Sequence, residues 1–164
     1  MSKFQVDNEE LKQELKNYVD SCEFKDVKDR NGNWKRKIKK RGEIPPRLGE
    51  MVLKIAEGLA TKGNWRSYTW REDFISRAVL TVLKYMHNFD YEQYDNAHGY
   101  INMICSHAFL QYIQEEKKKH TKMKQFLYDK KDEMTQTDEK GMAIDYTELC
   151  DKDWFEDQED YLIE

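Results

Sequence analysis

Histidine and cysteine are the side chains from which a metal site or a nucleophilic active site would most readily be built. The four histidines stand at positions 87, 98, 107 and 120. Cys105 and His107 are two residues apart in a segment expected to be helical, so their side chains point roughly 200° apart and are poorly placed to share a metal. Ser106 and His107 are adjacent and equally badly placed to form a catalytic pair. We therefore expect no metal site and no nucleophilic catalysis in this segment.

The remaining signatures of catalysis are also missing from the sequence. It contains no glycine-rich phosphate loop, no dinucleotide fingerprint and no GxSxG elbow. Acidic pairs such as Asp151 and Asp153 could hold a divalent cation, but in an acidic run such residues are usually just solvated. We expect a protein that is not an enzyme and that needs no cofactor.

Side chains suited to nucleic-acid recognition are concentrated between residues 100 and 124. One face of a helix there would offer donors and acceptors for base edges or splayed single-stranded bases, from Asn102, Ser106, His107 and Gln111. A group of lysines that could neutralise phosphates follows: Lys117, Lys118, Lys119, Lys122 and Lys124. Two alternatives stay open, since Tyr100 and Phe109 could be core residues only and the lysines could form a solvated helix end.

Helices are the elements expected to position these side chains. Apolar residues recur at spacings of three and four, which predicts helices over about residues 8–20, 47–60 and 69–87, and a long one from Asn96 into the charged segment beyond residue 113. Asp7 or Asn8 should cap the first helix, with Glu10 placed as in a capping box. No segment alternates with period two for long enough to predict a strand, and no internal repeat occurs. The predicted fold class is all-α.

Two segments lack helical periodicity. Residues 25–41 are rich in Lys and Arg and run into Pro45 and Pro46, so we expect a mobile basic linker whose Trp34 and Ile38 could anchor it to a partner. Residues 131–164 hold 13 Asp and Glu against 3 Lys, a net charge of −10, which leaves +6 on residues 1–130. We expect a basic body that can approach DNA and an acidic tail that is disordered until bound, although the tail could serve solubility alone.

The apolar stretches and the cysteines of the sequence indicate in which cellular compartment the protein acts. No apolar stretch approaches the roughly 20 residues that would span a bilayer, and the first residues lack the apolar core of a signal peptide. Cys22, Cys105 and Cys150 are odd in number and far apart, which fits free thiols in a reducing compartment. These features predict a cytoplasmic protein that does not interact with membranes.

The segment 73–113 contains an acidic and apolar pair at Asp73 and Phe74, a Phe-Asp step at residues 89 and 90, and an aromatic residue at Tyr100. With these features it resembles region 2 of bacterial sigma factors. In that family a helix opens with an acidic and apolar pair, a short loop carries a Phe-Asp or Phe-Glu step, and a second helix with an aromatic residue ends at the promoter. Asp73 with Phe74, then Phe89 with Asp90, then Tyr100 occupy these places without a gap.

The resemblance is strongest to the late-transcription sigma factors of T-even-type bacteriophages. The shared segments are IAEGL at 55–59, HNFD at 87–90, AHGYI at 97–101 and the end DYLIE at 160–164. The resemblance implies an N-terminal helix and linker over 1–46, a helical region 2-like core over 47–130 and an acidic tail over 131–164. It also implies a protein that is monomeric when free and acts in the cytoplasm of an infected bacterial host.

The resemblance assigns partners to three groups of residues. It implies contact with the clamp coiled-coil of bacterial core RNA polymerase by Asp73, Ser76, Arg77, Leu80 and Lys84. It implies promoter DNA contacts in the helix that carries Tyr100 and Met103. The chain end would bind the phage sliding clamp through Tyr161, Leu162 and Ile163, a short apolar anchor after an acidic run.

Departures from ordinary sigma factors modify this expectation. The two adjacent tryptophans that help melt the promoter are replaced by Met103 and Ile104, and the Arg-Gln step that follows is replaced by Ser106 and His107. Base preference should therefore differ. The chain also offers no room for the helix-turn-helix domain that reads the upstream promoter box.

Two other functional classes fit the same residues. One is an independent helical DNA-binding regulator, which would use the basic face without polymerase and show strong sequence preference on duplex DNA. The other is an adaptor that joins polymerase to the sliding clamp without touching DNA. It would tolerate neutralisation of the lysines between 117 and 124, whereas a sigma factor would not.

Overall fold

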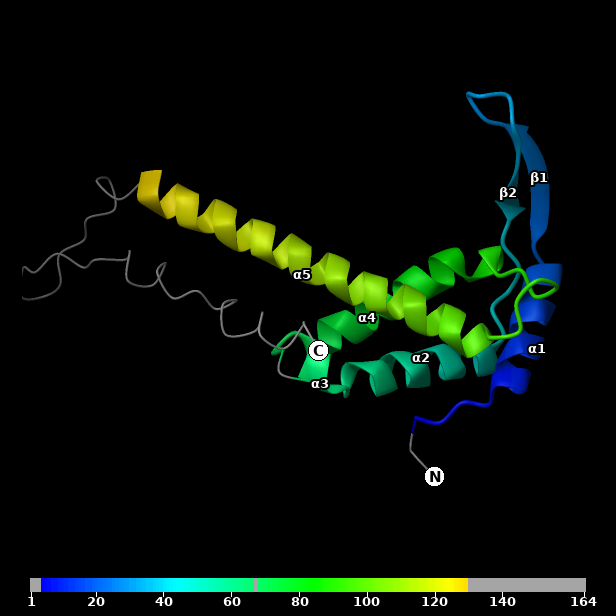
Figure 1. Cartoon of the computed structure of the whole chain (residues 1–164), viewed down its shortest axis with the longest axis horizontal. Coiled ribbons are helices and arrows are strands. Elements are labelled where there is room, and N and C mark those ends of the chain that lie inside the picture. Colours follow the sequence, from blue (N-terminus) through cyan, green and yellow to red (C-terminus); the bar gives the residue numbers. More distant parts are fainter. Residues whose placement is uncertain (1–3, 67, 130–164) are drawn as a thin grey trace, which may run out of the picture. The chain divides into compact units, whose positions relative to one another are not determined.

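The computed structural model describes residues 4–66 and 68–129. The chain divides into two units, Met1–Phe109 and Leu110–Glu164, and each is described by itself. The elements in chain order are α1 (Asn8–Asp20), β1 (Glu23–Lys28), β2 (Trp34–Lys40), α2 (Pro46–Ala60), α3 (Gly63–Arg66), α4 (Arg71–Tyr85), the 3-10 turn η1 (Met86–Asn88) and α5 (Ala97–Asp129) (Figure 1). The fold is thus mostly helical, with one small antiparallel sheet.

The four predicted helices are confirmed as α1, α2, α4 and α5, and their ends follow local sequence signals. The Asp7 carboxylate accepts a hydrogen bond of 2.9 Å from the Glu10 backbone N–H and so caps α1. Pro46 begins α2, where its missing N–H costs no helical hydrogen bond. The Asn96 side chain caps α5 by accepting a 2.7 Å bond from the Gly99 N–H.

The Glu10 side chain has a different use from the one expected. Its carboxylate faces the Arg47 guanidinium at the start of α2, with Nε–Oε1 at 2.8 Å and Nη2–Oε2 at 3.1 Å. This two-pronged ion pair lowers the pKa of Glu10 through hydrogen bonding and links α1 to α2. The capping-box prediction therefore describes the Asp7 half of the motif, while Glu10 serves tertiary structure.

An aromatic cluster forms part of the core of the first unit. Phe74 of α4 is fully buried and lies 5.1 Å from the ring of Phe109 in α5 and 5.3 Å from that of Tyr68. Trp65 of α3 packs edge-on against Phe109, also at 5.1 Å. Rings offset or edge-on at these separations attract beyond their area of contact. This cluster fixes α4 against the first turns of α5, which are the two elements singled out by the sequence.

The all-α prediction is wrong in one segment, because the expected mobile linker over residues 25–41 forms a β-hairpin. β1 and β2 pair antiparallel, with Lys25 opposite Lys37 and Lys28 opposite Trp34. The turn is organised by Asp29, whose carboxylate accepts bonds from the N–H groups of Asn31 and Asn33 at 2.9 and 3.0 Å. Gly32 takes a φ of +82°, a conformation that glycine adopts without strain. Figure 1 shows the hairpin extending away from α2 and α4.

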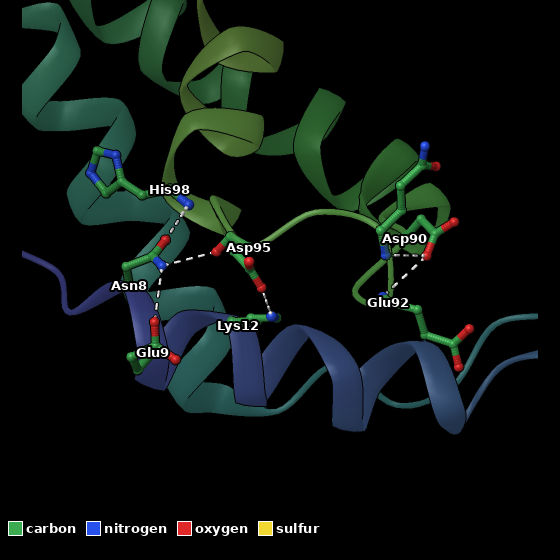
Figure 2. Close-up of polar contacts among 8 residues, drawn as sticks. Asn8, Glu9, Lys12, Asp90, Glu92, Asp95 and His98 are labelled. Carbon is green, nitrogen blue, oxygen red and sulfur yellow. Dashed lines mark hydrogen bonds and ion pairs between the residues drawn. The ribbon is translucent and has the colours of Figure 1, made fainter.

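The loop between α4 and α5 is held against α1 by polar contacts (Figure 2). The Asn8 side chain donates to the Asp95 carbonyl at 3.0 Å and accepts from the His98 N–H at 3.1 Å. Lys12 forms an ion pair with the Asp95 carboxylate, which lowers the pKa of that carboxyl. The Tyr91 hydroxyl donates to Asp20 at 2.6 Å. Residues 8–20 therefore fix the point at which α5 begins.

None of the helices in the described ranges combines the length and apolar character that a membrane crossing would require.

Candidate functional site

The outer face of α4 is the first candidate surface. Successive spacings of three, one, three and four residues bring Asp73, Ser76, Arg77, Leu80 and Lys84 into one stripe along the helix. The opposite stripe, with Phe74, Ala78 and Val82, is fully buried. The structure therefore brings together the residues that the resemblance links to polymerase, and places them on the accessible side of α4.

Leu80 is the unusual member of this face, because 65% of its surface is exposed. The same stripe of α4 carries polar side chains, of which Asp73, Ser76 and Lys84 are exposed and Arg77 is half-buried. A large apolar side chain at the centre of a polar rim is the arrangement found at protein–protein hot spots. The α4 face therefore presents one large exposed apolar side chain on an intact helix, among polar side chains.

Within the first unit, the first turns of α5 present a smaller polar face than expected. Met103 is 49% exposed and His107 is exposed, while Asn102 is half-buried. The Ser106 hydroxyl donates to the Asn102 carbonyl of its own helix at 2.9 Å, so its proton is not offered outward. Asn102, Met103 and His107 are therefore the side chains here with free capacity to meet a partner.

Tyr100 has an internal role. Its hydroxyl donates to the Tyr85 carbonyl at 3.1 Å and its ring lies 5.0 Å from that of Phe89. Burial raises the pKa of its phenol. Phe109 is fully buried in the aromatic cluster, so the core alternative is confirmed for Phe109. A DNA contact by Tyr100 stays a prediction, and it would have to use the part of the ring that Phe89 leaves accessible.

The second unit contains Gln111 and the lysines of α5. The Gln111 amide donates to Glu115 at 3.1 Å. Lys119 pairs with Glu116, and this hydrogen bond raises the Lys119 pKa. Lys118 and Lys122 are exposed, and no ion pair of theirs occurs among the residues that the structure describes. Lys117 is half-buried and Lys124 likewise, so the lysines of this segment are not equivalent.

The Phe-Asp step of the loop has a local physical reason. Phe89 is 3% exposed and packs on Tyr100, whereas the Asp90 carboxylate accepts from the N–H groups of Glu92 and Gln93 at 3.1 and 3.2 Å (Figure 2). The aromatic side chain anchors the loop in the core and the carboxylate caps the turn that follows. These two residues position α5, and neither presents reactive chemistry.

A cavity of about 330 Å³ lies beside this loop, with Val19, Phe24, Arg36 and His87 in its lining. His87 is 9% exposed, and its Nδ1 has no hydrogen-bond partner among the described atoms. Burial, with the nearby charge of Arg41, lowers the pKa of this imidazole, which favours the neutral form. The Nδ1 atom of His87 can take part in one further hydrogen bond here, which falls short of a catalytic set.

The cysteines and acidic residues likewise offer no active centre in the part of the chain that is described. Cys22 and Cys105 are free and buried, and burial raises the pKa of the Cys105 thiol to about 12, so its reactive thiolate is suppressed. No group of three or more His, Cys, Asp or Glu side chains is placed to hold a metal ion among residues 4–66 and 68–129. Tyr161, Leu162 and Ile163, with Cys150, lie outside the described residues.

The basic hairpin, defined as residues 23–41, is the feature that the sequence analysis missed as a structured element. It holds nine Lys and Arg against three Asp and Glu, a net charge of +6, so the rest of residues 1–130 is neutral overall. The Asn31-Gly32 dipeptide was the available signal, since this pair is strongly preferred in tight hairpin turns. The hairpin, and not the body as a whole, carries the basic charge.

No protein-family model matches the chain, and a search of curated proteins finds no match to it.

Proposed function

We propose that this chain is a sigma factor, a non-catalytic subunit that binds bacterial core RNA polymerase and directs it to recognise and open a promoter. The observation that carries the proposal is the outer face of α4, where Leu80 is 65% exposed at the centre of a polar rim. An exposed apolar side chain on a polar face is available to a protein partner. The resemblance to region 2 of sigma factors points to the clamp coiled-coil of polymerase as that partner.

Promoter contact is assigned to α5. In the first unit Asn102, Met103 and His107 combine amide, thioether and imidazole groups on exposed or half-buried positions. Such a mixture can hydrogen-bond to base edges and also pack against an unstacked base. In the second unit Lys118 and Lys122 are suited to phosphates, which would fix register and carry no sequence information.

Stimulation by a sliding clamp completes the proposal and comes from the resemblance, since Tyr161, Leu162 and Ile163 lie outside the described residues. Burying two or three apolar side chains would contribute roughly 3 to 6 kcal/mol before the cost of ordering the chain end. A clamp encircling the same DNA would raise the effective concentration of polymerase at the promoter. This would help to hold polymerase at the promoter.

Run-off transcription tests the proposal. Host core polymerase should initiate on an AT-rich late-type template only when the chain is added, and permanganate should detect an open bubble. We expect replacement of His107 and Gln111 by Ala to reduce the bubble and alter base preference, and replacement of Lys118 and Lys122 by Ala to weaken binding on every template alike. A chain that binds duplex DNA with strong sequence preference and leaves core polymerase inactive would be an independent regulator, and the proposal would be wrong.

A further inference from the structure

The two faces of the basic hairpin differ in whether their positively charged side chains interact with other groups of the hairpin. Strand partners share a face of an antiparallel pair and successive residues alternate. One face contains Phe24, Lys28, Trp34 and Arg36, and its cations lie on its own aromatic rings: the Arg36 guanidinium is 3.7 Å from the Phe24 ring centroid and Lys28 Nζ is 5.2 Å from that of Trp34. The cations of this face therefore interact with aromatic rings of the hairpin itself.

The opposite face, which we call the lysine face, contains Lys25, Lys35 and Lys37. Lys35 pairs with Asp29 at 3.3 Å. Lys25 and Lys37 stand directly opposite each other, both are exposed, and neither makes an ion pair with any residue in the described ranges. Like charges directly opposite in a sheet are destabilising. The hairpin thus keeps a repulsive pair at its centre although an uncharged residue at either position would remove the repulsion.

A polyanion would convert this repulsion into attraction. The hairpin has a net charge of +6, which equals the whole net charge of residues 1–130 because the rest of that segment is neutral overall. The lysine face carries no aromatic ring on which a base could stack, which is the usual device of single-strand binding surfaces. Duplex DNA has the denser phosphate array, and its major groove admits a two-stranded ribbon.

We propose that the lysine face of the basic hairpin binds the phosphate backbone of duplex DNA, independently of sequence and of the promoter contacts assigned to α5. The site is formed by Lys25 and Lys37, with Lys35 beside them. DNA binding at this site requires neither polymerase nor a promoter. The proposal for the hairpin therefore does not depend on the proposed sigma function.

Fluorescence anisotropy with the full chain tests this site on a labelled duplex of about 30 base pairs that lacks any late-type element, titrated with salt between about 50 and 200 mM. Each phosphate contact contributes about 0.9 to the slope of log K against log salt. Replacing Lys25 and Lys37 by Gln should therefore reduce the slope by about 1.8. The matched control replaces Lys62 and Arg66 by Gln, two exposed cations on the helical body, and should leave the slope unchanged.

A second variant separates binding from folding. Lys37→Glu places an acid opposite Lys25, so the melting temperature should rise while DNA binding falls further than in the Gln variant. The proposal is overturned if the wild-type chain does not bind the duplex. It is overturned as well if the slope of log K against log salt is unchanged when Lys25 and Lys37 are replaced, or if the control variant reduces that slope by as much. It is also overturned if a single strand of equal length binds as tightly. Loss of polymerase capture with an unchanged slope would identify an acidic protein surface as the partner instead.

Discussion

The helical body of the first unit and the basic hairpin differ in the burial of their side chains and in their net charge. In the body, large apolar side chains such as Phe74, Phe109 and Leu48 are fully buried, and residues 1–22 with 42–109 hold ten Lys and Arg against thirteen Asp and Glu. In the hairpin no side chain is fully buried, and the net charge is +6. Because burial governs stability and net charge governs attraction to polyanions, the two properties should respond to different mutations.

The largest expected effect is on the stability of the body. Phe74→Ala removes the ring that meets Tyr68, Trp65 and Phe109, and should lower the free energy of unfolding by about 3–5 kcal/mol. The control on the same helix is Leu80→Ala, which should change it by less than about 0.5 kcal/mol because Leu80 is exposed. Urea unfolding followed by circular dichroism measures both. A loss below about 1 kcal/mol for Phe74→Ala would mean that the aromatic cluster contributes little to the stability of the core.

A smaller effect is expected where α1 holds the loop. Asn8→Ala removes the hydrogen bonds to the Asp95 carbonyl and from the His98 N–H, and should cost about 1–2 kcal/mol of unfolding free energy. Gln13→Ala is the control in the same helix, because that exposed side chain bonds to Asn17 one turn on within the same helix and should contribute close to nothing. Equal losses for the two variants, in the same urea experiment, would show that the loop is held by other contacts.

The helices could be predicted because their apolar residues repeat with the helical period over three or more turns. The α4 face followed from the same period, since spacing alone brings Asp73, Leu80 and Lys84 onto one side. The hairpin could not be found this way, because the four apolar residues of its two strands do not alternate along the chain, and lysine is a poor strand former. What organises it is the local turn at Asp29 and Gly32.

The role of Tyr100 could not be predicted from the sequence either. The sequence predicts the helix that carries it, but its partners are the Tyr85 carbonyl and the Phe89 ring, which only the folded loop brings near. The same holds for Glu10, whose capping pattern is local while its ion pair with Arg47 spans two helices. Local patterns predict elements, and the partner of a polar side chain depends on tertiary structure.

The outer face of α4 is the surface of the body from which Leu80 projects, and its binding to core polymerase is the central claim. The direct test is co-purification of the chain with core polymerase after Leu80→Asp, with Leu53→Asp on α2 as the matched control. Leu53 is 42% exposed, so both variants should fold. We predict that Leu80→Asp weakens the complex about 30-fold, as loss of a hot spot of about 2 kcal/mol would do, and that Leu53→Asp binds like the wild type. Equal binding by the two variants, or no binding by the wild-type chain, would contradict the account.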